Sequence, residues 1–146
     1  MAREELLGKL YGVVVIPPVV ASELAEGAVT QPSIDRVLHA HWLTVRTLNS
    51  QQRVNELLAE IDEGEAEAIA LYEELHADLL LVDDQEARLL AKKLGLSQIG
   101  LLGLLAEAKL KGLIHEPLAQ VLDELLSLGF RASSALINAI LNKVGE

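Results

Sequence analysis

The spacing of apolar residues changes several times along the chain, and each change predicts a structural element. Val13 to Ile16 and Leu79 to Val82 are continuous apolar runs, typical of parallel strands covered on both faces. Trp42 to Leu48 alternates apolar and polar residues over most of its length, which indicates a strand with one solvent-exposed face. Leu96 to Ile99 is a further short strand. Helical spacing predicts helices at residues 2–11, 17–27, 33–39, 51–61, 65–75, 85–94, 100–111, 117–128 and 133–144.

Proline, glycine and serine set several of these predicted boundaries. Two prolines at 17–18 end the first strand and begin a helix, which we expect to close at Gly27 after one or two turns. Ser33 is predicted to cap the next helix. Because strands alternate with helices, the chain is predicted to form one α/β domain over residues 1–146 with a mainly parallel sheet.

Composition narrows the class of protein. Apolar residues make up 51% of the chain and aromatic residues only 3%, so the core must be aliphatic. The absence of cysteine excludes disulfides and thiolate sites, and it fits an intracellular protein. We find no signal peptide and no apolar run that approaches a membrane span, and we therefore expect a cytoplasmic protein with no membrane partner.

The net charge of −10 disfavours broad, sequence-independent binding to nucleic acid, because such binding normally requires a basic surface. It does not exclude a nucleic-acid enzyme, because clustered carboxylates can hold a divalent metal ion that meets the phosphate. An acidic surface that only keeps the protein soluble would give the same charge.

The stretch from Gly64 to Asp84 contains the main functional signal. It is predicted to be a helix, a tight turn and a buried strand that ends at Asp83 and Asp84. Open α/β sheets bind ligands at the carboxyl ends of their strands. We therefore expect Glu23, Glu65 and Asp83 to gather at one edge of the sheet.

Each candidate also has a purely structural interpretation. Glu23 could be an ordinary exposed helix residue, and Glu65 stabilises a helix N-terminus by roughly 0.3–1 kcal/mol without any function. Asp83 or Asp84 could cap the following helix. Arg88 could form an i,i+4 ion pair with Asp84, or contact a phosphate at the rim of the acidic site.

Helical geometry separates the two glutamates of the GEAE segment. At about 100° per residue, Glu65 lies beside Ile69 and Tyr72 and borders the apolar face, whereas Glu67 lies on the opposite side beside Glu74. A carboxylate beside a buried face is costly unless it has a partner. Glu65 is therefore the predicted site residue, and Glu67 is predicted to be solvated.

Three segments together resemble the PIN domain: VVVIPPVVASEL, GEAEAIALYEELHADLLLVDDQEARLLAKKLGL and GLLGLLAEAKLKGLI. They are most similar to small prokaryotic PIN-like proteins with a GEAEAI motif, which are related to VapC-type toxins. The resemblance implies a three-layer α/β/α fold and a metal-dependent ribonuclease that hydrolyses phosphodiester bonds of RNA. It also implies Mg²⁺ or Mn²⁺ as cofactor, Glu23, Glu65 and Asp83 as catalytic metal ligands with Asp84 assisting, and an antitoxin-like protein as partner.

The sequence departs from the PIN pattern at its start. PIN domains begin with a strand that ends in an aspartate and forms the middle of the sheet, whereas residues 1–10 match the helix that follows it. We expect this first strand and its ligand to be missing from the chain, and the gap to be closed by rearrangement, by another segment or by a partner chain. The alternative function is therefore a catalytically impaired interaction or regulatory subunit. The leucine-rich helices 100–111 and 117–128 then form either core or the face of a homo-oligomer.

Overall fold

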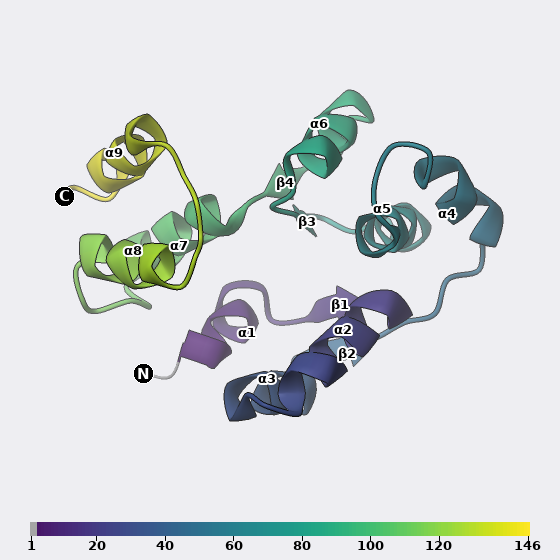
Figure 1. The fold of residues 1–146 in the computed structure, drawn as a ribbon, viewed down its shortest axis with the longest axis horizontal. Helices are drawn as coiled ribbons and strands as arrows, with labels where there is room; N and C mark the ends of the chain where they lie inside the picture. Colours follow the sequence, from purple (N-terminus) through teal and green to yellow (C-terminus); the bar gives the residue numbers. More distant parts are fainter. Residues whose placement is uncertain (1–2) are drawn as a thin grey trace. The chain divides into compact units, whose positions relative to one another are not determined.

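The computed structural model describes residues 3–146, which form two compact units that join between Ile99 and Gly100 (Figure 1). The N-terminal unit contains, in order, a 3₁₀ turn (Arg3–Glu5), α1 (Leu6–Tyr11), β1 (Val14–Ile16), α2 (Pro18–Ala28), α3 (Pro32–Leu38), β2 (Leu43–Val45), α4 (Gln51–Leu57), α5 (Glu63–Leu75), β3 (Leu80–Leu81), α6 (Gln85–Lys93) and β4 (Gln98–Ile99). The C-terminal unit contains α7 (Leu101–Leu110), α8 (Leu118–Ser127) and α9 (Ser134–Lys143).

All strand pairs in the described residues are parallel, which confirms the predicted α/β class. β1 pairs with β2, with Val15 opposite Thr44, and β3 pairs with β4, with Leu81 opposite Ile99. The two pairs form separate two-stranded sheets. No segment of residues 3–99 joins them, so the expectation that rearrangement or another part of the chain closes the gap is not met.

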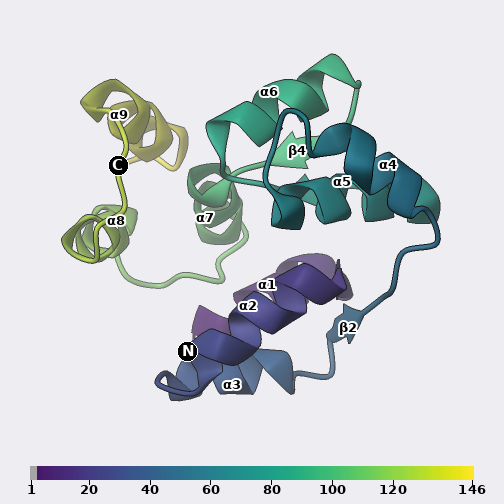
Figure 2. The same cartoon turned by 45° about the vertical axis from the view of Figure 1, so that its right-hand side comes forward.

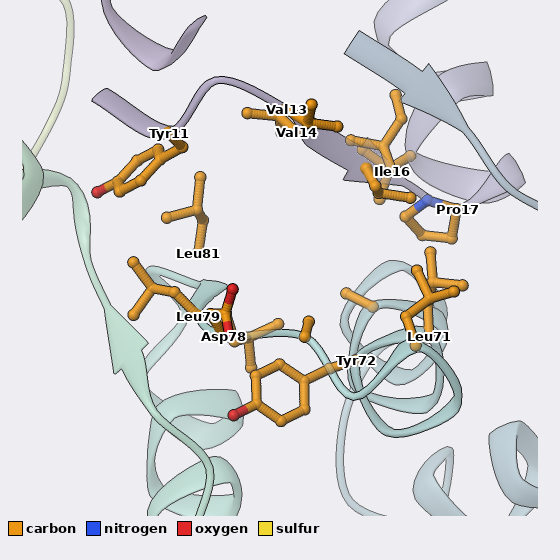
Figure 3. A pocket seen from close by; sticks show the side chains of 16 residues that line it. Tyr11, Val13, Val14, Ile16, Pro17, Leu71, Tyr72, Asp78, Leu79 and Leu81 are labelled. Atoms are coloured by element: carbon orange, nitrogen blue, oxygen red, sulfur yellow. The ribbon is translucent and has the colours of Figure 1, made fainter. Parts of the chain in front are cut away.

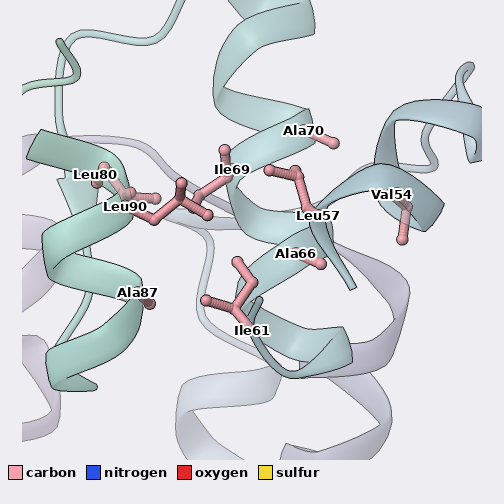
Figure 4. Packing of buried hydrophobic residues seen from close by; sticks show 10 residues of the cluster. Val54, Leu57, Ile61, Ala66, Ile69, Ala70, Leu80, Ala87 and Leu90 are labelled. Atoms are coloured by element: carbon pink, nitrogen blue, oxygen red, sulfur yellow. The ribbon is translucent and has the colours of Figure 1, made fainter. Parts of the chain in front are cut away.

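The core of the N-terminal unit is built around α5. Its buried face, including Ala66 and Ile69, packs against α4, α6 and β3 (Figure 4). A forked ion pair adds to the α4–α5 contact, since Arg53 Nε and Nη2 donate to the two carboxylate oxygens of Glu73 at 2.8 and 3.1 Å. This carboxylate raises the pKa of Arg53 above its usual value, mainly through these hydrogen bonds.

Two predicted boundaries of the second and third helices are wrong. α2 continues to Ala28 because Gly27 lies inside the helix, where α3 packs closely: a Cβ at Gly27 would lie 2.9 Å from Ile34 Cδ1. The helices run side by side in Figure 2. Ser33 does not cap α3, which begins one residue earlier at Pro32, and the N-cap residue is Gln31.

α1 packs closely on the indole ring of Trp42, the residue before β2. Trp42 is only 3% exposed, and a Cβ at Gly8 would overlap its ring atoms. A glycine in the middle of a short helix normally weakens it by roughly 1 kcal/mol relative to alanine. Here the missing side chain allows the helix to cover the ring.

A carboxylate supports the start of α8 in the C-terminal unit. Glu146 Oε2 accepts a hydrogen bond from the Leu118 amide at 2.7 Å, and Oε1 accepts one from the Ala119 amide at 3.1 Å. These two amides hold the pKa of Glu146 below its ordinary value. Ser133 caps α9, because its side chain accepts a hydrogen bond from the Leu136 amide.

None of the helices described between residues 3 and 146 has the length and apolar content needed to cross a membrane.

We predict that Gly8→Ala lowers the free energy of unfolding by roughly 1–3 kcal/mol, because the new methyl group overpacks the ring of Trp42. Urea titration followed by the fluorescence of Trp42, the single tryptophan, measures this change. Gly27→Ala is the comparison, because its methyl group meets only the flexible end of Ile34. Equal effects of the two substitutions would contradict the account of Gly8.

We predict that Glu146→Gln destabilises the chain at pH 7 and that this effect becomes smaller as the pH falls below about 4.3. The pKa of Glu146 is lowered in the folded state, so its stabilisation is complete above the unfolded pKa, about 4.3, and is lost as the pH falls through the folded pKa. Urea unfolding of both proteins at several pH values, followed by circular dichroism, measures the difference. A difference that stays constant between pH 7 and pH 3 would exclude this role.

Candidate functional site

The carboxylate of Glu23, one of the predicted acidic residues, lies beside the first turn of α5, a segment far away in the chain. Glu23 lies on α2, and its Oε1 and Oε2 atoms are 3.4 and 3.9 Å from the position that a Cβ would occupy on Gly64. Glu65 is the next residue, in the first turn of α5. Glu23 is exposed and Glu65 is half-buried, so water reaches this place. The absence of a side chain at Gly64 leaves room for the Glu23 carboxylate.

Glu67 is buried, and the prediction that it is solvated is wrong. It is 8% exposed, and its Oε1 accepts a hydrogen bond from the Val19 amide at 3.1 Å. The helical wheel considers only the apolar face of α5 itself, whereas α2 packs against the side on which Glu67 lies.

The start of α2 explains why this acceptor comes from another helix. The N-cap residue of α2 is Pro17, whose side chain makes no cap hydrogen bond. The first amides of a helix have no partner inside the helix, and a carboxylate is favourable near them. Two features of the sequence could have indicated this contact. α2 begins with prolines that supply no cap, and α5 is rich in glutamate.

Asp83 and Asp84 follow β3 after one intervening residue, Val82, and both are exposed. Asp84 Oδ2 accepts a hydrogen bond from the Ala87 amide at 3.0 Å, which confirms the interpretation of Asp84 as the cap of α6. The cap uses only one of the two carboxylate oxygens of Asp84, so the other oxygen can still bind a metal ion.

Arg88 does not form the expected ion pair with Asp84. Its Nε donates to Gln98 Oε1 at 3.3 Å, and Gln98 Nε2 donates to the Arg88 carbonyl oxygen at 2.6 Å. These bonds connect α6 to β4 and leave the guanidinium group exposed. The contact with a phosphate stays a prediction.

The donor chemistry suits a hard divalent cation only in part. Carboxylate oxygens are the ligands that Mg²⁺ and Mn²⁺ prefer. Between residues 3 and 146, however, no three His, Cys, Asp or Glu side chains form a group that could hold a metal ion. The structure thus brings Glu23 to the start of α5 beside Glu65 but does not add Asp83 to form a complete centre, and no reaction step through a metal ion follows from these residues alone.

Comparison with known proteins adds one match. A family model described as a PIN domain matches residues 1–146. No curated protein and no solved structure matches the chain significantly.

We predict that Glu67→Ala lowers the free energy of unfolding by about 1–2 kcal/mol, because it leaves the Val19 amide without its acceptor. Glu67→Gln should cost less, since its amide oxygen can accept the same bond. Urea titration followed by Trp42 fluorescence measures both. Glu63→Ala, at an exposed position of the same helix, is the control and should change stability by no more than about 0.5 kcal/mol. A Glu67→Ala effect no larger than that of the control would exclude the capping role.

Proposed function

The chain belongs to the PIN-domain family, and from this premise we propose that it is a Mg²⁺- or Mn²⁺-dependent ribonuclease that hydrolyses phosphodiester bonds of RNA. The family match supports a nuclease-like protein that binds nucleic acid. The metal ion, the RNA substrate and the catalytic residues are parts of our proposal.

The observation that carries the proposal is the meeting of Glu23 with the first turn of α5. Glu23 and Glu65 are 42 positions apart in the sequence, yet the Glu23 carboxylate lies against Gly64, the neighbour of Glu65. Both side chains carry carboxylate oxygens, the ligands that Mg²⁺ and Mn²⁺ prefer. In nucleases a divalent ion held by carboxylates activates water and stabilises the charge on the phosphate.

The remaining predicted residues receive roles within this proposal. Asp83 is the third catalytic ligand, placed after β3 where the ligand edge of an α/β sheet lies. Asp84 assists with the carboxylate oxygen that does not cap α6. Arg88 contacts a phosphate of the RNA with its exposed guanidinium group.

A second candidate function is an interaction or regulatory subunit on a PIN scaffold. The lack of a three-carboxylate group among residues 3–146 favours it. In this case the partner would be a protein, such as an antitoxin-like chain or a second copy in a homo-oligomer, and the carboxylates would hold no metal.

We predict that the chain binds Mn²⁺ in calorimetric titration and cleaves single-stranded RNA only when Mg²⁺ or Mn²⁺ is present. The double variant Glu65→Gln with Asp83→Asn should abolish the binding and reduce the cleavage rate by at least about 100-fold, because each substitution removes a charged ligand.

The double variant Glu63→Gln with Glu86→Gln is the matched control. It removes the same charge from the first turn of α5, which also holds Glu65, and from the first turn of α6, which begins two residues after Asp83. The control should bind and cleave like the unmodified chain. Absence of binding at millimolar Mn²⁺, or equal cleavage by both double variants, would reject the nuclease and leave the interaction subunit.

A further inference from the structure

The phosphates of an RNA strand would meet no cation in the pocket of about 410 Å³ between β1 and β3 of the N-terminal unit. Apart from Asp78 and two tyrosine hydroxyl groups, the side chains that line this pocket are purely hydrocarbon (Figure 3). Binding to RNA requires lysine or arginine side chains that are exposed and not already paired with carboxylates. The position of such side chains therefore indicates where a strand of RNA would lie.

Few cations of the N-terminal unit are both exposed and free of ion pairs. Arg36 and Arg53, for example, each donate to a glutamate, at 2.7 and 2.8 Å. Within residues 3–99, the exposed cations that make no ion pair are Arg46, Arg88, Lys92 and Lys93. Three of these four side chains lie on α6, whose only acidic residue is Glu86.

These cations lie on the side of α6 that faces away from the core. Buried residues of α6, including Ala87 and Leu90, pack into the apolar cluster around α5 (Figure 4). At about 100° per residue, the opposite face of the helix carries Arg88, Leu89 and Lys92, with Lys93 next to them. All four are exposed, and we call them the α6 stripe. The stripe is positive on a chain whose net charge is −10.

The stability of the helix explains only part of the α6 stripe. Lys92 and Lys93 lie in the last turn of α6, where a positive charge interacts favourably with the helix dipole. Arg88 lies in the middle of the helix, and Asp84 caps the helix instead of pairing with Arg88. The side chain of Arg88 donates only through Nε, to Gln98 Oε1 at 3.3 Å. The two terminal nitrogens of its guanidinium group therefore remain available to a phosphate.

The α6 stripe begins close to one of the proposed catalytic residues. α6 starts two residues after Asp83, and Arg88 lies in its second turn. At a rise of 1.5 Å per residue, Lys92 follows Arg88 by about 6 Å along the same face of the helix. A strand that extends from Asp83 along α6 would meet Arg88 first and the two lysines next. An acidic peptide could pair with the same charges, but the position of the stripe beside Asp83 favours the substrate.

We propose that the α6 stripe binds the phosphate backbone of single-stranded RNA, with Arg88 nearest to the cleaved phosphate and Lys92 and Lys93 on neighbouring phosphates. Leu89 lies between the cations and contacts a sugar or base of the same strand. A single strand is favoured over a duplex because the stripe is narrow and the chain as a whole is acidic. The inference rests on the proposed ribonuclease function and adds the direction in which the RNA extends from the acidic residues.

The salt dependence of RNA binding tests this proposal. The probe is a fluorescent RNA of about twelve uridines, and its anisotropy is measured in EDTA, so that no metal ion contributes to binding or cleavage. Each phosphate contact with a single strand adds about −0.7 to the slope of log affinity against log salt concentration. The triple variant Arg88→Gln, Lys92→Gln and Lys93→Gln should therefore reduce the slope by about 2. Between about 50 and 200 mM salt, this variant should lose about 20-fold less affinity than the unmodified chain loses.

A matched control separates the α6 stripe from a general effect of charge. The triple variant Arg46→Gln, Arg131→Gln and Lys143→Gln replaces three exposed cations outside α6 and changes the net charge by the same amount. It should leave the slope nearly unchanged. Equal slopes for the two triple variants would overturn the proposal. Binding of a polyglutamate peptide without any binding of RNA would assign the stripe to an acidic protein and would also overturn it.

Cleavage measured with Mn²⁺ distinguishes failure of the α6 stripe from failure of the ribonuclease. RNA that binds through the stripe in EDTA but is not cleaved with Mn²⁺ would support the stripe and reject the nuclease. Cleavage with Mn²⁺ together with an unchanged slope in the α6 variant would keep the nuclease and overturn the stripe. Lys92→Gln alone should reduce the slope by about 0.7, and it keeps the test valid if the triple variant does not fold.

Discussion

The packing of α2 against α5 determines most of what the N-terminal unit presents to its surroundings. Its clearest polar element is the hydrogen bond from the Val19 amide to Glu67, which joins residues 48 positions apart. Because Glu67 is a buried polar side chain, it depends on this partner as much as the start of α2 depends on Glu67. The contact places Glu23 beside Gly64, and with it the predicted acidic site beside the first turn of α5.

The same N-terminal unit combines a nearly complete helical core with an incomplete sheet. α4, α5 and α6 bury a continuous aliphatic cluster, including Ile69 and Val54, which are fully enclosed. β1 and β3 each have a partner on only one edge. Parallel sheets are normally buried and have more strands than two.

The sequence predicted the parts of the structure that depend on local pattern. The β-branched run 13–16 was predicted to be a parallel strand, and residues 14–16 of it form β1. The cap at Asp84 was one of the stated interpretations. The prediction that α2 ends at Gly27 was wrong. Gly27 lies inside the helix, where the absence of its side chain leaves room for Ile34 of α3. The burial of Glu67 could not be read from the periodicity of α5, since the buried side depends on where α2 packs.

The most direct test of this account is a nuclear Overhauser measurement on isotope-labelled protein, between the methyl protons of Val20 and the α protons of Gly64. The account predicts a cross-peak, because Val20 Cγ2 lies 3.8 Å from the position that a Cβ would occupy on Gly64. If the cross-peak is absent while α2 and α5 are both helical, the two helices do not pack in this way, and the grouping of the carboxylates is wrong.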